Sequence, residues 1–250
     1  MKSIPTLIFY ALTSLLPFQK LGAQEYTTAR AHSHNDYEQA NPFWLAFIEN
    51  YGSIEADIHL LNGELYVSHD AKAIRADRTL KNLYLDPLSS VQPTYRKLQL
   101  LIDVKTEAIA TLDTLVSVLK RYPAIIQNSN ITIVISGNRP LEESYSKYPS
   151  FIWMDGRPGI NYSKEALSRV ALISASMQQY TGVTWPPNKQ ADSLIRKVIS
   201  DAHALGKPIR FWATPDSWDA WNRLVNWGVD YINTDHLVEL RQYLQRISCQ

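Results

Sequence analysis

The sequence has a single cysteine, Cys249, which excludes an intrachain disulfide. Its 25 basic and 24 acidic residues nearly cancel, and a formal net charge of +1 gives no electrostatic footprint for nucleic acid or an acidic membrane surface. No glycine-rich phosphate loop follows any predicted strand, which disfavours a nucleotide-binding doubly wound sheet. Beyond the N-terminal region, no segment approaches the about 20 continuous apolar residues of a membrane helix.

The N-terminal segment has the layout of a secretory signal peptide. Met1 and Lys2 give a short charged start, residues 4–16 are mostly apolar, and Leu21-Gly22-Ala23 offers small residues for cleavage. We therefore expect residues 1–23 to be a leader, residues 24–250 to be one domain, and the mature protein to be secreted or periplasmic.

Strand and helix patterns alternate along the rest of the chain. Apolar, mostly β-branched runs predict strands at residues 100–103, 131–135, 151–154, 170–173, 209–212 and 231–233. Helical patterns cover residues 140–148, 188–205 and 216–227, with Gly206 and Gly228 ending the last two. This alternation predicts a parallel sheet. With about eight strands in a chain of this length, a single-domain (β/α)8 barrel of the TIM type, in the α/β class, is favoured.

Asn62-Gly63 interrupts the alternation with a strong hairpin signal between residues 58–61 and 64–67. The strand that carries Glu55 and Asp57 should therefore turn back and bring His69 to the same end of the sheet. Barrel enzymes place their chemistry at the C-terminal ends of the strands, which is where these polar residues fall.

Four short clusters hold the acids and histidines. They are Ala31-His32-Ser33-His34-Asn35-Asp36-Tyr37, Ile54-Glu55-Ala56-Asp57, Ser68-His69-Asp70 and Asp103-Val104-Lys105. In the second cluster, the i, i+2 spacing points both carboxylates to one face of a strand. Taken one at a time, such an acid pair, histidine or Asp-x-Lys is most often solvent-facing, structural or a plain ion pair. All four clusters in this order, at predicted strand ends, are better explained by a single functional site.

Two carboxylates aimed into a barrel mouth repel each other unless a cation lies between them. Glu55 and Asp57, with Asp103 as a third oxygen donor, predict one hard divalent cation, Ca²⁺ or Mg²⁺. Lys105 adds a positive charge, and the group as a whole suits an anionic substrate.

The order of these motifs resembles the PLC-like phosphodiesterase superfamily, in its glycerophosphodiester phosphodiesterase and phosphatidylinositol-specific phospholipase C members. Glu55-Ala56-Asp57 is similar to the metal-binding Glu-x-Asp of that superfamily, Ser68-His69-Asp70 to the segment bearing its second histidine, and Asp103-Val104-Lys105 to its Glu-x-Lys. Phe211-Trp212-Ala213-Thr214 and residues 228–235 resemble its closing motifs. The His-Ser-His-Asn-Asp-Tyr run at residues 32–37 most resembles the branch containing altered inheritance of mitochondria protein 6.

The resemblance implies a metal-dependent phosphoric diester hydrolase with two catalytic histidines, acting on a small-molecule or lipid phosphodiester. His69 is one histidine. The other is His34, in the phospholipase pattern where Asn35 helps to bind metal, or His32, in the glycerophosphodiesterase pattern. Ser33 stands where glycerophosphodiesterases have a phosphate-binding Arg, so Lys105 or Arg210 is expected to replace it, with Trp212 as a pocket wall or a core aromatic.

Two other functions fit parts of the sequence. His32-x-His34 followed by a late Asp235 resembles metal-dependent amidohydrolases, but these need further histidines or a bridging lysine on the middle strands, and no histidine lies between His69 and His203. A secreted, non-catalytic binding domain on a decayed barrel would be expected to have lost ligand acids, and all three are present. His59, His203 and His236 lie outside any motif and are expected to be structural or exposed.

Overall fold

The structure is a computed structural model that describes residues 26–91 and 96–248. The predicted leader, residues 1–23, lies outside the described residues. The strands are β1 (Ala31–Ser33), β2 (Ser53–Leu61), β3 (Glu64–Val67), β4 (Leu98–Val104), β5 (Ile131–Gly137), β6 (Ile152–Gly156), β7 (Val170–Ser176), β8 (Ile209–Trp212) and β9 (Ile232–Thr234). The α-helices are α1 (Trp44–Ile48), α2 (Asp86–Ser90), α3 (Ala108–Leu119), α4 (Pro123–Ile126), α5 (Lys164–Leu167), α6 (Gln178–Thr181), α7 (Lys189–Ala204), α8 (Trp218–Trp227) and α9 (Leu237–Ser248).

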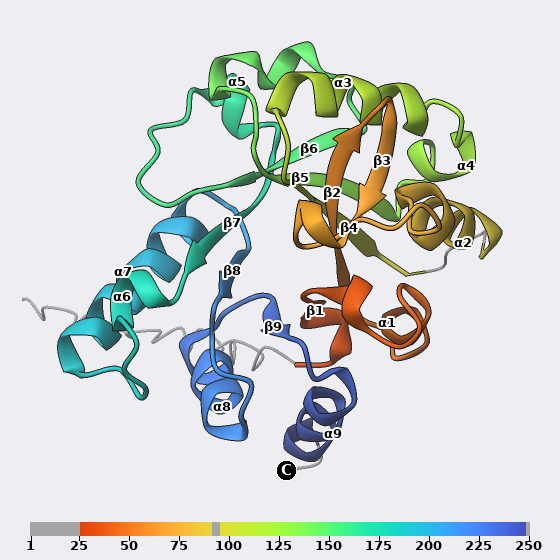
Figure 1. The fold of residues 1–250 in the computed structure, drawn as a ribbon. Helices are drawn as coiled ribbons and strands as arrows, with labels where there is room; N and C mark the ends of the chain where they lie inside the picture. Colours follow the sequence, from red (N-terminus) through yellow and green to blue (C-terminus); the bar gives the residue numbers. More distant parts are fainter. Residues whose placement is uncertain (1–25, 92–95, 249–250) are drawn as a thin grey trace, which may run out of the picture.

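The strands form one sheet in the order β8-β7-β6-β5-β4-β2-β1-β9, with β3 attached to β2. Every neighbouring pair along this path is parallel, and a bridge between Arg210 and Tyr231 brings β8 against β9 and nearly closes the ring. Figure 1 looks onto this ring, with the helices around its outside. The predicted single-domain TIM-type barrel is confirmed.

Alternation along the strands separates the barrel interior from the helix-covered outer layer. Ile54, Ala56 and Ile58 of β2 are buried in the core that also holds Leu112 and Leu115 of α3. The residues between them on β2, Glu55 and Asp57, therefore face the other way, into the barrel. Their strand ends are level with those of the next strands, because Asp57 pairs with Asp103 and Asp103 with Ser136.

The hairpin prediction is also confirmed. Asn62 and Gly63 have φ values of 51° and 82°, the left-handed pair of a tight turn between β2 and β3. Ile58 then pairs with Val67, and the backbone N–H of Ser68 donates to the carbonyl of Asp57 at 3.2 Å. His69 is thereby returned to the end of the strand that carries the acids.

Two predicted helices form with the expected ends. Asn188 caps α7 by accepting from the N–H of Ala191, and Gly206 follows it with φ 68°. Helix α8 begins two residues later than predicted because Ser217 caps it, and Gly228 ends it with φ 81°.

The helix predicted at residues 140–148 is wrong in type and extent. Only a 3-10 segment, Glu142–Lys147, forms there, because Pro149 follows and disfavours helical backbone at Tyr148. Within the described ranges, none of the helices is long and apolar enough to cross a membrane.

Candidate functional site

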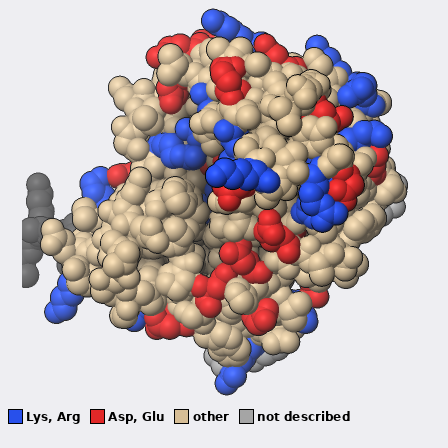
Figure 2. All heavy atoms as spheres, in the orientation of Figure 1, with Lys and Arg blue, Asp and Glu red and all other residues tan. Residues whose placement is uncertain are grey.

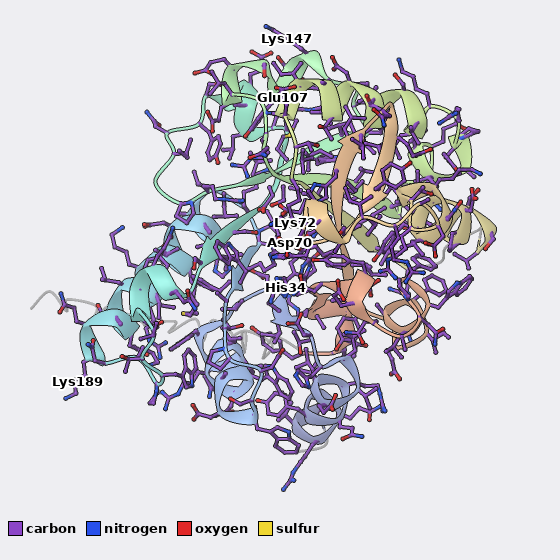
Figure 3. All side chains as sticks on the ribbon, viewed as in Figure 1. His34, Asp70, Lys72, Glu107, Lys147 and Lys189 are labelled. Carbon is purple, nitrogen blue, oxygen red and sulfur yellow. The ribbon has the colours of Figure 1, made fainter. Side chains whose placement is uncertain are left out.

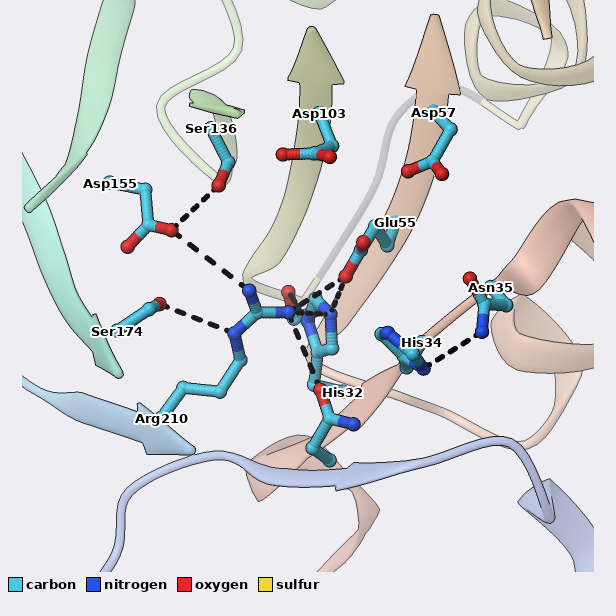
Figure 4. Close-up of polar contacts among 12 residues, drawn as sticks. His32, His34, Asn35, Glu55, Asp57, Asp103, Ser136, Asp155, Ser174 and Arg210 are labelled. Carbon is cyan, nitrogen blue, oxygen red and sulfur yellow. Dashed lines mark hydrogen bonds and ion pairs between the residues drawn. The ribbon is translucent and has the colours of Figure 1, made fainter. Parts of the chain in front are cut away.

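Three carboxylates meet inside the barrel, two from β2 and one near the C-terminal end of β4. Glu55, Asp57 and Asp103 each direct one oxygen into a group whose members lie within 4.8 Å of one another. Figure 4 shows the first two on one strand and the third on its neighbour. Glu55 and Asp57 are 5% and 1% exposed, so their charges are shielded from water. This buried acidic cluster is a set of oxygen ligands that can hold a metal ion.

The buried guanidinium of Arg210 forms an ion pair with the acidic cluster. Its Nη1 lies 2.7 Å from Oε2 of Glu55, and its Nε donates to Ser174 Oγ at 3.2 Å. Burial alone would raise the pKa of Glu55, but the Arg210 guanidinium holds that pKa well below its usual range. Only 4% of the Arg210 side chain is exposed, so it lies under the cluster rather than at an open surface.

Asp57 and Asp103 share a single cation, Lys105. Lys105 Nζ lies 2.9 Å from Oδ2 of Asp57 and also contacts Oδ2 of Asp103. Burial would lower the pKa of Lys105, but these two carboxylates raise it. Burial and the neighbouring Glu55 raise the pKa of Asp57, and Asp57 Oδ1 is buried without a hydrogen-bond partner among residues 26–91 and 96–248. An unpaired buried carboxylate oxygen is what an oxygen-preferring cation would satisfy.

His69 is tied to the acids through its Nδ1. That nitrogen lies 3.1 Å from Oδ2 of Asp57 and 3.2 Å from the Tyr37 hydroxyl. The His69 side chain is 62% exposed. His59 fixes the segment from beneath, because its buried Nε2 is 3.0 Å from the carbonyl of Ser68 and 3.3 Å from that of His69.

His34 lies on the other side of Tyr37. Its Nδ1 is 2.8 Å from Oδ1 of Asp235, which follows β9, and 3.0 Å from Nδ2 of Asn35. The Tyr37 hydroxyl is 2.7 Å from both Asn35 Oδ1 and Asp57 Oδ2. Asn35 thus sits between the histidine and the tyrosine, with the left-handed φ of 45° that asparagine tolerates.

The two histidines left open by the sequence have different surroundings. His32 is 0% exposed, with Nε2 2.6 Å from Glu55 Oε2, in contact with Arg210 as well, and Nδ1 2.7 Å from Ser53 Oγ. Burial and Arg210 lower the pKa of His32 to about 4. For His34, burial would lower the pKa, but the hydrogen bond to Asp235 and the charge of Glu55 raise it overall.

The structure also locates the tryptophan and the other two histidines considered in the sequence. Trp212 ends β8 two residues after Arg210 and is 38% exposed. His203 is bonded to Asp230 at 2.7 Å, and His236 is exposed. Figure 3 labels His34 near the middle of the view, and Figure 2 shows acidic and basic side chains around a hollow there.

Several residues of the site were missed from the sequence. Tyr37 lay within a recognised motif but was given no role, and Asp235 was considered only as the late acid of the amidohydrolase alternative. Asp155 and Arg157 were overlooked although they have the same i, i+2 spacing as the acids of β2. Asp155 Oδ2 accepts from Ser136 Oγ and from Arg157 Nη1, both at 2.8 Å.

Two family models match parts of the chain. The AIM6-like phosphodiesterase domain matches residues 23–94, and the glycerophosphoryl diester phosphodiesterase family matches residues 208–237. An altered inheritance of mitochondria protein 6 homolog from Arthroderma benhamiae is 28% identical over 85% of this chain and 82% of its own length. Altered inheritance of mitochondria protein 6 from Lachancea thermotolerans is 25% identical over 88% of this chain and 67% of its own.

Among solved structures, a glycerophosphodiester phosphodiesterase from Parabacteroides distasonis aligns with a TM-score of 0.61 and 16% identity, covering 87% of this chain and 96% of that one. At that identity the likeness shows the shared barrel fold. Together, the comparisons confirm that the chain resembles the altered inheritance of mitochondria protein 6 branch of the PLC-like phosphodiesterases.

Proposed function

We propose that this chain is a metal-dependent phosphoric diester hydrolase of the glycerophosphodiesterase and phospholipase C type, using two histidines for general acid–base catalysis. The observation that carries the proposal is the convergence of three carboxylate oxygens within 4.8 Å, with His69 bonded directly to one of the acids. His34 joins the same group through Asn35 and Tyr37.

Glu55, Asp57 and Asp103 would hold one divalent cation, with Asn35 as a further oxygen donor predicted by resemblance. An all-oxygen donor set favours Ca²⁺ or Mg²⁺, and the unpaired Asp57 Oδ1 is a ready ligand atom. A bound cation would supply positive charge against the growing negative charge of the phosphoryl transition state.

Two histidines are proposed to carry out the two proton transfers of the reaction. In one assignment, His34, oriented by Asp235 through Nδ1, takes the proton of the attacking hydroxyl at its other ring nitrogen, and His69, oriented by Asp57, protonates the leaving oxygen. Imidazole serves both steps because its ordinary pKa lies near neutrality. We prefer His34 to His32 because His32 is wholly buried and its pKa of about 4 keeps it uncharged.

Lys105 is proposed to face the anionic substrate from the acid side, and Trp212, part-exposed at the end of β8, to form one wall of its pocket. Arg210 has 4% of its side chain exposed and contacts Glu55, so we assign it to positioning that acid rather than to binding the substrate.

The test is a panel of phosphodiesters, with glycerophospho-, inositol- and sphingolipid-type headgroups, assayed with and without chelator. Phosphorus NMR of the products separates hydrolysis by water from internal attack that gives a cyclic phosphate. Turnover that is lost in chelator and restored by Ca²⁺ or Mg²⁺ supports the proposal, and chelator-insensitive turnover contradicts the metal role.

The binding-domain alternative predicts no turnover of any diester and no stabilisation by any divalent ion. The amidohydrolase alternative is disfavoured by the middle strands, whose inward polar residues include Ser136, Asp155 and Ser174 and no histidine.

We also propose that the protein is exported through residues 1–23. Mass spectrometry of the mature protein should find a new N-terminus near Gln24, and retention of Met1 in an exported product would contradict the leader.

A further inference from the structure

Arg157 is a cation at the barrel mouth to which neither the motifs nor the comparisons give a role. It follows β6, two residues after the fully buried Asp155. Its Nη1 donates to Asp155 Oδ2 at 2.8 Å and to the Gly156 carbonyl at 2.9 Å. Ser136 Oγ donates to the same Asp155 oxygen at 2.8 Å. One end of the guanidinium is therefore held rigidly by an acid that is itself fixed.

The other edge of the guanidinium is open. Within the described part of the chain, Arg157 Nε makes no hydrogen bond, and Nη2 makes only a long contact of 3.4 Å with Ser136 Oγ. The side chain is 31% exposed. Nε and Nη2 form the side-on fork of an arginine, whose two parallel N–H groups match two oxygens of a phosphate. Burial would lower the pKa of Arg157, but the Asp155 carboxylate raises it, so the fork stays charged.

The residues that hold Arg157 lie across the mouth from His34. Asp103 and Ser136 are register partners on β4 and β5, and the charge of Asp103 reaches Arg157. In Figure 4, Ser136 and Asp155 lie on the opposite side of the three acids from His34 and Asn35. An anion bound to a cation in the acid cluster would thus have the residues that hold Arg157 on one side and the His34 imidazole on the other.

The two other positions at which the sequence places a phosphate-binding arginine are not available. Arg210 has 4% of its side chain exposed and contacts Glu55, His32, Ser174 and Asn233. Ser33, at the position where the resemblance would place an arginine, is buried and donates to Asp36 Oδ1 at 2.7 Å.

We propose that Arg157 is the phosphate-binding arginine of this chain, with Asp155 and Ser136 as the residues that position it. The proposal rests on the proposed function for its substrate, a monoanionic phosphodiester whose non-ester oxygens would face the fork and the cation that the acid cluster would hold. It takes the phosphate-binding role from Arg210 and adds to Lys105 a second cation, placed just after β6.

The experiment compares Arg157→Ala and Arg157→Lys with the parent protein in kinetics and in titrations with inorganic phosphate, in the presence of Ca²⁺ or Mg²⁺. The control is Arg196→Ala, which removes an exposed arginine of α7 paired with Asp192. Loss of two charge-assisted hydrogen bonds should raise KM and the phosphate Kd about 10- to 100-fold in Arg157→Ala, with a smaller fall in kcat. Arg157→Lys keeps the charge without the fork and should fall between, while Arg196→Ala matches the parent.

Phosphate affinity equal to the parent's in Arg157→Ala overturns the proposal. If that variant does not fold by circular dichroism, Arg157→Lys decides by the same criterion, because it retains a cation beside Asp155. If the parent turns over no diester, the hydrolase function fails, but the phosphate titration still decides the role of Arg157: loss of binding in the variants upholds it, and unchanged binding overturns it.

Discussion

Nδ1 of His69 lies 3.1 Å from Oδ2 of Asp57. This contact joins a histidine that follows the hairpin to an acid on the strand before it. It fixes the ring through one nitrogen and, among the described residues, leaves Nε2 without a hydrogen bond. Such an arrangement is expected of an oriented general acid or base.

His69→Ala should therefore abolish turnover while leaving the fold intact, because the side chain is mostly exposed and packs little. We expect kcat to fall by about 10²- to 10⁴-fold, the usual contribution of acid–base catalysis. Steady-state kinetics and circular dichroism provide the measurement. His203→Ala, which removes another exposed histidine bonded to an acid, is the control and should retain activity. Full activity in His69→Ala would remove the two-histidine scheme.

A divalent cation should stabilise the folded protein through the acid cluster. At a concentration 100 times Kd, binding contributes about 2.7 kcal/mol, or a rise in Tm of about 5–10 °C for a chain of this size. Asp57→Asn should lose most of this shift, whereas Asp201→Asn, an exposed acid of α7, should keep it. Thermal melts with and without Ca²⁺ or Mg²⁺ measure the effect. A parent protein with no divalent shift would argue for the binding domain without a metal.

Tyr37→Phe removes a hydroxyl that contacts Asp57, Asn35 and His69. Asp57 Oδ2 is buried and would lose a donor, so we expect a loss of about 1–2 kcal/mol in unfolding free energy and a lower kcat. Urea denaturation and kinetics measure the two effects. Tyr122→Phe, which loses an exposed bond to Asp86, is the control and should leave kcat unchanged. An unaltered kcat in Tyr37→Phe would show that the hydroxyl does not position these groups.

Arg210→Met tests the charge beneath the site. It leaves Glu55 buried without its nearest cation, and Asp155 loses a guanidinium at 3.9 Å. Breaking a buried ion pair from one side typically costs about 3–5 kcal/mol, so the midpoint of urea unfolding should fall sharply. A loss below about 1 kcal/mol, the range of surface pairs, would indicate that Glu55 is neutral in the folded protein.

Acid should weaken the protein partly through Asp155. Burial would raise the pKa of Asp155, but Arg157 and Arg210 lower it below its ordinary value. A carboxyl with a depressed folded-state pKa stabilises fully above its unfolded pKa of about 3.9, and this contribution is lost as pH falls through the folded value. The stability difference between the parent and Asp155→Asn should therefore be large at neutral pH and shrink towards the acid limit. A pH-independent difference would contradict the depressed pKa.

The sequence was sufficient for the barrel and for the acids because both follow from local rules. Asn62-Gly63 requires a tight turn wherever it lies between two strands, and the spacing of Glu55 and Asp57 aims both carboxylates the same way. Strand register then brings Asp103 level with Asp57. No long-range information beyond the parallel sheet was needed for that step.

The choice between His32 and His34 needed the tertiary structure. His32 is the middle residue of β1 and pairs with both Ser53 and Asn233, which closes it into the barrel interior. His34 lies one residue beyond the strand, where the ring reaches Asp235, about 200 positions along the chain. The spacing of residues in the sequence does not predict this contact between the two ends of the barrel.

Arg157 was missed because the predicted strand stopped at Met154. The strand in fact runs to Gly156, with an irregular register after Met154 where it meets β7. That places Asp155 inside the barrel and sets Arg157 just beyond it. The Asp-x-Arg pair was a usable signal, since it repeats the spacing of Asp103 and Lys105 at the end of β4.

The acids and histidines come from one stretch of the polypeptide, and the proposed phosphate-binding arginine comes from another. Strands β1, β2 and β4 are consecutive neighbours, so the acids and both proposed proton carriers come from one arc encoded by residues 34–105. Strands β5 and β6 supply Ser136, Asp155 and Arg157 from a separate stretch. A change in the later stretch can therefore alter how the phosphate is held without replacing the acids or the two histidines of the earlier one.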